Sequence, residues 1–475
     1  MLQERRIPAQ LEKELRQYLE CGILCFGFAR ARCKGCGQGF VVAFSCKGRG
    51  VCPSCNGRRM AQTAAHLVDH VIPPVSVRQW VISVPKRLRC FLADRQSAVA
   101  ALTRIFISRV ERLLCTAVGL TSAATAPATA RPRLGAVSFV HRFGSALYQH
   151  VHLHACVTDG VFMPTGDETP AFLPARPITQ VHLASLTEKV RRRVVRWFRM
   201  QRLLDVAAAA DMLAWENSGF SIDASVRITL FRLQLRVYYQ PLEHLLRYCA
   251  RPPFALERLS VIRGADGRIT RVCYVLPRHK AANWVGPGRP RKSTRPGANG
   301  VVKLSPYEFL DRLADLVPPP RKHRHRYHGV FAPNHRLRKA VTALAIGNIC
   351  KLRDAATGGH AVGGYAAEGC CNTHEKPRSH DTSRIAWAKL MARVGEDFPF
   401  ACPGCGGDIR LIAFITDPGA IRKILTHLGE PLELPPVSPA RGPPTDWGEL
   451  VQPHDDRNVF QASPDELPAI DIHSL

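Results

Sequence analysis

Acidic residues are scarce in this 475-residue sequence, in which 38 Asp and Glu stand against 66 Lys and Arg. The formal net charge at pH 7 is therefore +28. Such an excess favours a polyanionic partner, and nucleic acid comes first among these. A basic membrane-surface protein is the competing interpretation. It fits poorly, because the chain shows no amphipathic anchor and no apolar run approaching the roughly 18 residues of a membrane span.

The chain also lacks an apolar leader, since residues 1–16 are charged throughout. We therefore expect a cytoplasmic protein, associated with the bacterial nucleoid because of its charge. Thiols stay reduced in that compartment. The 17 cysteines consequently indicate metal sites more than disulfides.

Seven of these cysteines lie within residues 21–60, in a segment rich in glycine and arginine. Two Cys-x2-Cys turns in it are fifteen residues apart: Cys33 with Cys36, and Cys52 with Cys55. Each turn presents two thiolates on one side, so that two turns can complete a tetrahedron around Zn²⁺. Zinc binding worth about 10–16 kcal/mol would supply the folding energy that so small a core lacks. The sequence thus predicts a structural zinc site.

The other cysteines leave alternatives open. Cys21, Cys25 and Cys46 could replace a ligand or simply be buried. Cys402 and Cys405 form another Cys-x2-Cys turn, which has no downstream pair to complete it. Residues across a long intervening stretch could do so: Cys370, Cys371, His374 or His380.

A predicted strand at residues 147–158 carries closely spaced histidines. Because successive strand residues point to opposite faces, His152 and His154 project side by side while Val151 and Leu153 face a core. Two imidazoles placed in this way can bind one divalent cation. The alternative is a pair of partly exposed sheet histidines with no ligand.

Further ligands for such a cation are not specified by the spacing. His150 and Cys156 extend the histidine face, and His141 on a predicted strand at 135–143 or Gln149 could contribute. Mg²⁺ or Mn²⁺ normally takes oxygen ligands as well. Asp159-Gly160, directly after the strand, predicts a tight hairpin turn.

Tyr248 lies on a predicted helix that begins near Pro241 and ends before Pro252. The apolar stripe of this helix consists of Leu242, Leu245, Leu246 and Cys249. On a helical wheel Tyr248 falls off that stripe, on the side that carries Arg251. A tyrosine beside a cation is suited to meet a phosphate; an ordinary boundary tyrosine is the alternative.

Basic segments elsewhere predict contacts with a nucleic-acid backbone. The helical region at 179–217 includes Arg192 and Arg196, and a basic block occupies 321–328. Neutralisation of phosphates by such residues would make binding steeply dependent on salt.

Five ordered segments resemble rolling-circle transposases of the insertion sequence ninety-one and common-region type. They are Phe44–Cys55, Arg142–Phe162 with its histidines, Arg247–Leu259 followed by Arg326–Pro333, and Cys402–Asp417. The resemblance covers roughly residues 20–430. It implies an HUH (His-hydrophobic-His) endonuclease, whose fold is an antiparallel sheet flanked by helices.

The resemblance also implies roles for individual residues. His152 and His154 would bind a catalytic Mg²⁺ or Mn²⁺, with His141 as a possible third ligand where the family has Gln, and Tyr248 would be the nucleophile. Arg247 and Arg251 would steady the phosphate of single-stranded transposon ends or target DNA. His244 occupies the place of a second tyrosine in some members, so this chain resembles a one-tyrosine form. Residues 229–240 depart from the usual sequence before the tyrosine.

The expected fold class is α+β, with a zinc-ribbon-like module, an HUH-type sheet, a small C-terminal region and a disordered tail. The expected divisions are 1–70 for zinc binding, 71–285 for catalysis, 286–350 as basic linker and accessory DNA-binding region, 351–384 as flexible linker, 385–430 as a second knuckle, and 431–475 as acidic tail. A replication initiator or relaxase with the same chemistry, and a zinc-dependent DNA-binding protein that does not cut, remain alternatives. The oligomeric state is not specified.

Overall fold

The structure is a computed structural model, which describes most of the chain between residues 7 and 433. The described residues are 7–120, 131–144, 146–165, 170–216, 218–229, 235–254, 258–276, 300–318, 322–345, 348, 402, 404–407 and 409–433. The predicted linker at 351–384 and nearly all of the predicted acidic tail lie outside them, as do Cys370, Cys371, His374 and His380. Within the described part, no helix combines the length and apolar character needed to cross a bilayer.

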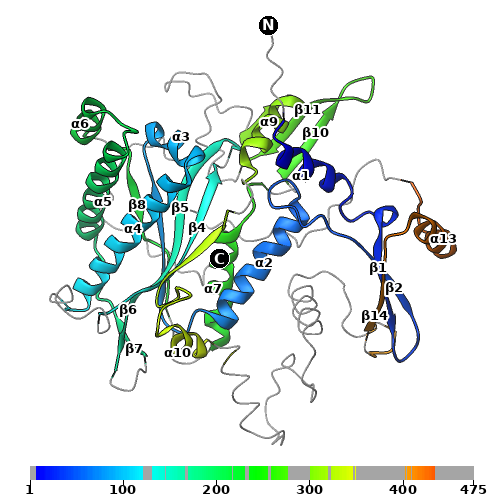
Figure 1. The fold of residues 1–475 in the computed structure, drawn as a ribbon, viewed down its shortest axis with the longest axis horizontal. Helices are drawn as coiled ribbons and strands as arrows, with labels where there is room; N and C mark the ends of the chain where they lie inside the picture. Colours follow the sequence, from blue (N-terminus) through cyan, green and yellow to red (C-terminus); the bar gives the residue numbers. More distant parts are fainter. Residues whose placement is uncertain are drawn as a thin grey trace, which may run out of the picture.

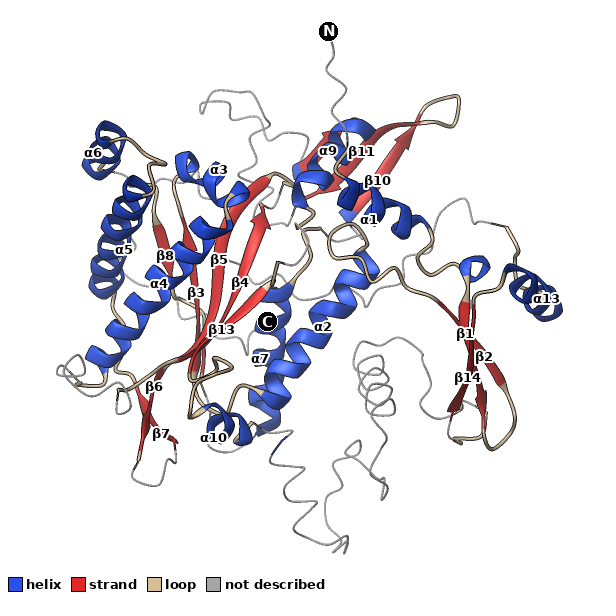
Figure 2. Ribbon diagram, in the orientation of Figure 1, coloured by secondary structure: helices blue, strands red, loops and turns tan. Residues whose placement is uncertain are grey.

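An antiparallel sheet forms the centre of the molecule (Figure 2). Its strands run in the order β13-β4-β5-β3-β8, and the short β9 also pairs with β3. Their bounds are β3 Val77–Ser83, β4 Gly135–Phe143, β5 Gln149–Thr158, β8 Ser221–Asp223, β9 Arg227–Ile228 and β13 His325–Gly329. The expected α+β class with an antiparallel sheet is therefore confirmed.

Helices cover both faces of this sheet (Figure 1). One face packs on α3 Lys86–Asp94, α4 Gln96–Ala117, α5 Gln180–Met200 and α6 Val206–Ala214. Val151 and Leu153 of β5 enter that core together with Trp80. Each fully buried side chain of this size contributes about 2–3 kcal/mol through the area it removes from water.

The other face carries the histidines and packs on α2 Pro53–His70, α7 Leu235–Ala250 and α10 Arg338–Ala343. Leu67 and Val68 of α2 meet Leu242 and Leu245 of α7 in its core. The strand alternation expected for β5 is thus observed, with apolar residues on one face and histidines on the other.

The described residues also form three smaller sheets. β10 Leu259–Arg263, β11 Ile269–Val275 and β12 Val301–Leu304 form one, which shares a core with α1 Ala9–Leu19 and α9 Pro306–Leu316. β6 Gly160–Pro164 pairs with β7 Pro170–Pro174. β1 Phe28–Cys33 pairs with both β2 Gly39–Ala43 and β14 Ile409–Ile415, beside the single turn η1 Leu24–Phe26 and helix α13 Pro418–Leu428.

The prediction of a tight hairpin turn at Asp159-Gly160 is wrong. The chain bends there and continues into β6, which pairs with β7 instead of returning along β5. The reason is electrostatic, because the buried Asp159 carboxylate accepts hydrogen bonds from Arg78 and Arg227. A buried carboxylate bonded to two guanidiniums is held in the interior and cannot serve as an exposed turn residue.

The start of the tyrosine helix also differs from expectation, because α7 begins at Leu235 and contains Pro241. A proline removes one backbone donor and bends a helix without always ending it. Of the atypical segment at 229–240, residues 230–234 lie outside the described part.

Two strands belong to other parts of the fold than the expected domain divisions suggest. β13, from the 286–350 region, is a strand of the central sheet, where Tyr327 pairs with Val137 of β4. β14, from the 385–430 region, joins the N-terminal β1 in one sheet.

Candidate functional site

Three buried histidines meet on the α2/α7 face of the central sheet. β5 supplies His152 and His154, and neighbouring β4 supplies His141, which pairs directly with His152 in the sheet register. One nitrogen from each ring lies within 4.8 Å of the others. The expectation that these side chains share a face is confirmed, and His141 is the additional imidazole.

Hydrogen bonds orient two of these rings. Nε2 of His141 lies 2.7 Å from the carbonyl oxygen of Cys249, and Nδ1 of His152 lies 3.1 Å from that of His150. A carbonyl only accepts, so in each case the bonded nitrogen carries the hydrogen. The other nitrogen, Nδ1 of His141 and Nε2 of His152, then keeps a lone pair for a metal. Nδ1 of His141 is buried and has no hydrogen-bond partner among the described residues.

Gln79 orients the third ring, a role that sequence reasoning missed. Its side-chain amide lies 2.9 Å from Nδ1 of His154, across the β3–β5 pairing. The two ends of an amide are assigned from such contacts, so the amide can present its oxygen to an Nδ1–H. In that orientation Nε2 of His154 keeps the lone pair. The available signal was a glutamine directly before the apolar run Trp80–Ile82.

The cluster has the chemistry of a metal site. Burial, followed by the nearby charges of His154 and His152, lowers the pKa of His141 well below its usual value, so its ring is neutral at pH 7. Neutral imidazoles bind divalent transition metals well, whereas Mg²⁺ prefers oxygen. Among the described residues, no carboxylate joins the three histidines. Gln149, the other candidate ligand, is exposed and lies on the alternate face of β5.

Tyr248 lies against this cluster. Its ring centroid is 5.7 Å from that of His154, with the rings inclined at 69°, and the guanidinium carbon of Arg251 lies 4.2 Å from the centroid of the tyrosine ring. The expectation that Tyr248 stands off the core is wrong, since only 2% of it is exposed. Because α7 lies along the histidine face of the sheet, residues beside its apolar stripe are covered as well.

The other predicted phosphate-binding arginines do not converge on the cluster. Arg247 forms an ion pair with Glu243 of its own helix, with Nη2 and Oε1 2.8 Å apart. Arg192 and Arg196 lie exposed on α5, which covers the opposite face of the sheet. Arg251, in contrast, lies with its guanidinium over the Tyr248 ring.

A basic cleft of about 300 Å³ opens beside the cluster. His141 and Arg251 form part of its wall, and the wall contains no carboxylate among the described residues. Its seven arginines and lysines come from four regions of the chain: Arg49, Arg59, Arg142, Arg251, Lys322, Arg324 and Arg326. Sequence reasoning had singled out the 321–328 block for DNA binding, and the structure places part of that block here.

Several of these cations donate side-chain hydrogen bonds to neutral partners. Arg324 donates to the side-chain oxygen of Asn56 over 2.8 Å, and Arg142 to the carbonyl of Ala93 over 2.9 Å. Burial, together with the nearby charges of Arg59 and Arg49, lowers the pKa of Arg324 to about 9. Positive charge held at close quarters in this way is stabilised by an anion, and the cleft is suited to a phosphate.

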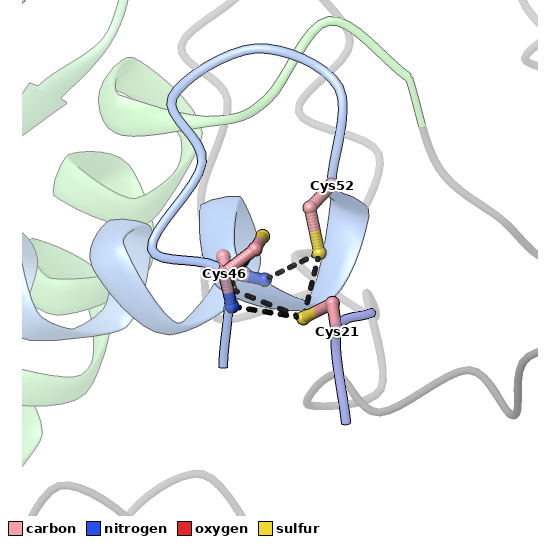
Figure 3. Close-up of side chains that lie close together, drawn as sticks. Cys21, Cys46 and Cys52 are labelled. Atoms are coloured by element: carbon pink, nitrogen blue, oxygen red, sulfur yellow. Dashed lines mark hydrogen bonds between the residues drawn. The ribbon is translucent and has the colours of Figure 1, made fainter. Parts of the chain in front are cut away.

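Cysteines form a group of four at the start of α2, where Figure 3 shows three of them. The group consists of Cys21, Cys46, Cys52 and Cys55. Sγ of Cys21 lies 3.6 Å from that of Cys52 and 3.7 Å from that of Cys55. Cys52 is also the N-cap of α2, so this group anchors the helix that packs against the tyrosine helix.

A second group of four lies at the end of β1: Cys33, Cys36, Cys402 and Cys405. The pairing expected from the sequence is therefore wrong, because Cys33 and Cys36 do not share a site with Cys52 and Cys55. The pairing of β14 with β1 brings the distant turn alongside the first one, while Cys21 and Cys46 complete the other group. All eight are free thiols.

Comparisons with known proteins agree with this organisation. Residues 1–84 match the family model "Transposase zinc-binding domain", and residues 135–339 match the model "Putative transposase". A similar protein is "Putative transposase y4qJ" of Sinorhizobium fredii (strain NBRC 101917 / NGR234), 23% identical over 327 residues, which are 67% of this chain and 74% of that relative. No solved structure matches significantly.

These matches define a transposase with a zinc-binding domain at its N-terminal end. More narrowly, the matched parts of the chain are similar to the insertion-sequence-91 (IS91) family of transposases.

Proposed function

We propose that this transposase is a one-tyrosine HUH endonuclease that nicks single-stranded DNA and stays linked to the 5′ phosphate through Tyr248. One observation carries the proposal: the Tyr248 ring lies 5.7 Å from the ring of His154, within a cluster of three histidines that fits a divalent ion. A nucleophile beside a metal site is the arrangement that cleavage of a phosphodiester requires.

The reaction exchanges one phosphodiester for another. The hydroxyl oxygen of Tyr248 forms a bond to phosphorus while the bond from phosphorus to the 3′ oxygen breaks. The phenol loses a proton and the 3′ oxygen gains one. Because the phosphotyrosine is itself a diester, a second transfer to a 3′ hydroxyl can rejoin strands without ATP.

Several groups of the chain support this step. An unperturbed tyrosine has a pKa of about 10, so its phenolate needs stabilisation at neutral pH. The Arg251 guanidinium over the ring can stabilise both the phenolate and the incoming phosphate. A divalent ion held by His141, His152 and His154 would draw charge from the scissile phosphate and the departing oxygen.

The DNA strand would enter along the basic cleft, whose wall includes His141 and Arg251. Tyr248 is buried behind this wall. Movement of the Arg251 side chain away from the ring would bring the phenol into contact with a phosphate in the cleft. Backbone contacts from arginines and lysines would then hold the strand without reading its sequence.

The test is an adduct assay with a single-stranded oligonucleotide bearing a transposon end, in the presence of Mn²⁺. Wild-type protein should give a DNA-linked band that survives denaturant, and Tyr248→Phe should give none while its DNA affinity stays unchanged. Tyr327→Phe is a matched control that should still form the adduct: Tyr327 also lies beneath an arginine, with the Arg338 guanidinium carbon 5.1 Å from its ring centroid, but it belongs to β13 and not to α7. Adduct formation by Tyr248→Phe would refute the proposal.

A further inference from the structure

The two Cys-x2-Cys turns of the second cysteine group lie face to face, although 366 residues separate Cys36 from Cys402. Sγ of Cys33 lies 3.4 Å from Sγ of Cys405, and Sγ of Cys36 lies 3.4 Å from Sγ of Cys402. Zinc–sulfur bonds of about 2.3 Å in a tetrahedron place neighbouring sulfurs about 3.8 Å apart. The observed separations are close to that value.

The backbone of each turn approaches the sulfurs of the other. A methyl group at Gly35 would lie 3.2 Å from Sγ of Cys405, and one at Gly407 would lie 3.2 Å from Sγ of Cys33. Only glycine allows so close an approach without a shift of the neighbouring atoms. The backbone N–H of Gly35 also donates to Sγ of Cys33 over 3.3 Å, as turns that hold thiolates do.

The strands behind these turns form one sheet. β1 pairs with β14 from Phe28 opposite Ile415 to Cys33 opposite Ile409. The C-terminal segment therefore supplies an integral strand of a module whose other strands come from the first 43 residues. The two turns emerge from the same end of that sheet.

This module has little apolar core of its own. Its buried cluster contains only Phe28, Ile421 and Leu425 among the described residues, while Phe414 of β14 is 67% exposed. A sheet this small gains too little from burial to offset the entropy of ordering it, and such units are usually stabilised by a metal.

We propose that Cys33, Cys36, Cys402 and Cys405 bind a structural zinc ion, so that the zinc-binding part of this transposase is closed by both ends of the chain. The matched zinc-binding model ends at residue 84 and does not include the second pair. Cys21, Cys46, Cys52 and Cys55 would bind a second zinc ion, so that the chain holds two zinc ions, each bound by four thiolates. This inference does not depend on strand cleavage by Tyr248.

Alkylation of the intact wild-type protein tests it without any substitution. Cys36, Cys405 and Cys90 are all exposed. Cys90 belongs to neither group, and it should react rapidly with iodoacetamide in every condition. Cys36 and Cys405 should react at least tenfold more slowly in zinc-loaded protein and as fast as Cys90 after chelation. Equal rates for all three in zinc-loaded protein would overturn the proposal.

Metal counting by mass spectrometry gives a second measurement. It is best made in a His152→Ala/His154→Ala background, so that the histidine cluster adds no ion. That protein should contain two zinc ions, and Cys402→Ser/Cys405→Ser and Cys33→Ser/Cys36→Ser should each contain one. Combining all four substitutions should still leave one ion, whereas Cys90→Ser should leave two. Two ions in the Cys402/Cys405 variant would contradict a shared site.

Discussion

The carbonyl of Cys249, the residue after Tyr248, accepts a hydrogen bond from Nε2 of His141. A histidine of the metal-site candidate is thereby bonded to the backbone of the tyrosine helix. The same bond sets the tautomer that leaves Nδ1 of His141 facing the other two rings. Ligand orientation and tyrosine position are therefore coupled through one contact.

Replacement of His141 should reveal this coupling. Mutation of a residue that only orients a metal ligand typically lowers metal affinity or activity by about 10–100-fold. Loss of a ligand in His141→Ala should therefore reduce adduct formation by at least about tenfold and raise the Mn²⁺ concentration needed for half-maximal rate. His141→Gln restores the residue that the family resemblance implies and should retain more activity than the alanine variant. Equal loss in both variants, with an unchanged Mn²⁺ requirement, would remove His141 from the site. Titration of Mn²⁺ in the adduct assay measures the adduct yield and the Mn²⁺ requirement of each variant.

The metal preference follows from the donor set. Three imidazoles without a carboxylate favour a transition metal over Mg²⁺. We expect Mn²⁺ to support nicking at a concentration about tenfold lower than Mg²⁺ requires, and dialysis against chelator to abolish it. Adduct yield measured across both titrations checks this. Activity after exhaustive chelation would show that the histidines act without a metal.

Arg324 should contribute to DNA binding through its place in the basic cleft. Arg324→Ala removes one charge-assisted phosphate contact. It should weaken binding of single-stranded DNA by about tenfold and reduce the magnitude of the slope of log affinity against log salt by about 0.7. Arg192→Ala is the matched control, because this exposed arginine lies on α5, across the sheet from the cleft. Fluorescence anisotropy over a range of salt concentrations measures both quantities. Equal effects of the two substitutions would mean that the cleft is not the binding surface.

Acid should destabilise the fold through histidines that are held neutral. Burial, followed by the charge of Arg326, lowers the pKa of His328 to about 4, and burial lowers the pKa of His141 well below its usual value. The unfolded chain, with a histidine pKa of about 6.5, takes up these protons first, so stability is lost as the pH falls from about 6.5 towards 4. His328 alone accounts for up to about 3 kcal/mol.

The control for this prediction is His328→Gln, in which an amide can hydrogen-bond to Ser138 as the Nε2 atom of His328 does over 2.8 Å. The melting temperature of this variant should fall less between pH 7 and pH 5 than that of the wild type. Identical pH profiles would show that His328 does not contribute to acid sensitivity.

The sequence was sufficient to predict β4, β5 and the shared face of His152 and His154, because strand periodicity is a local property. The buried position of Tyr248 was not predictable in the same way. A helical wheel defines the apolar stripe of α7, but not how much of the helix surface the sheet covers. Gln79 was missed for a related reason, since its partner His154 lies on another strand.

The pairing of the cysteines could not be deduced from spacing. Cys-x2-Cys turns are chemically equivalent, and the interval between Cys36 and Cys52 suits one shared site. The competing partner, Cys402, reaches Cys36 only because β14 pairs with β1. No local signal near either residue indicates that long-range contact.

Mapping the linked nucleotide identifies the nucleophile of the proposed reaction. Wild-type protein is allowed to react with a single-stranded oligonucleotide and Mn²⁺, digested with nuclease and protease, and analysed by tandem mass spectrometry. We expect a nucleotide joined through its 5′ phosphate to Tyr248. Attachment of the nucleotide to another residue, such as Tyr327 or Tyr148, would show that Tyr248 is not the nucleophile. The same conclusion would follow if protein that has nicked its substrate gave no linked peptide.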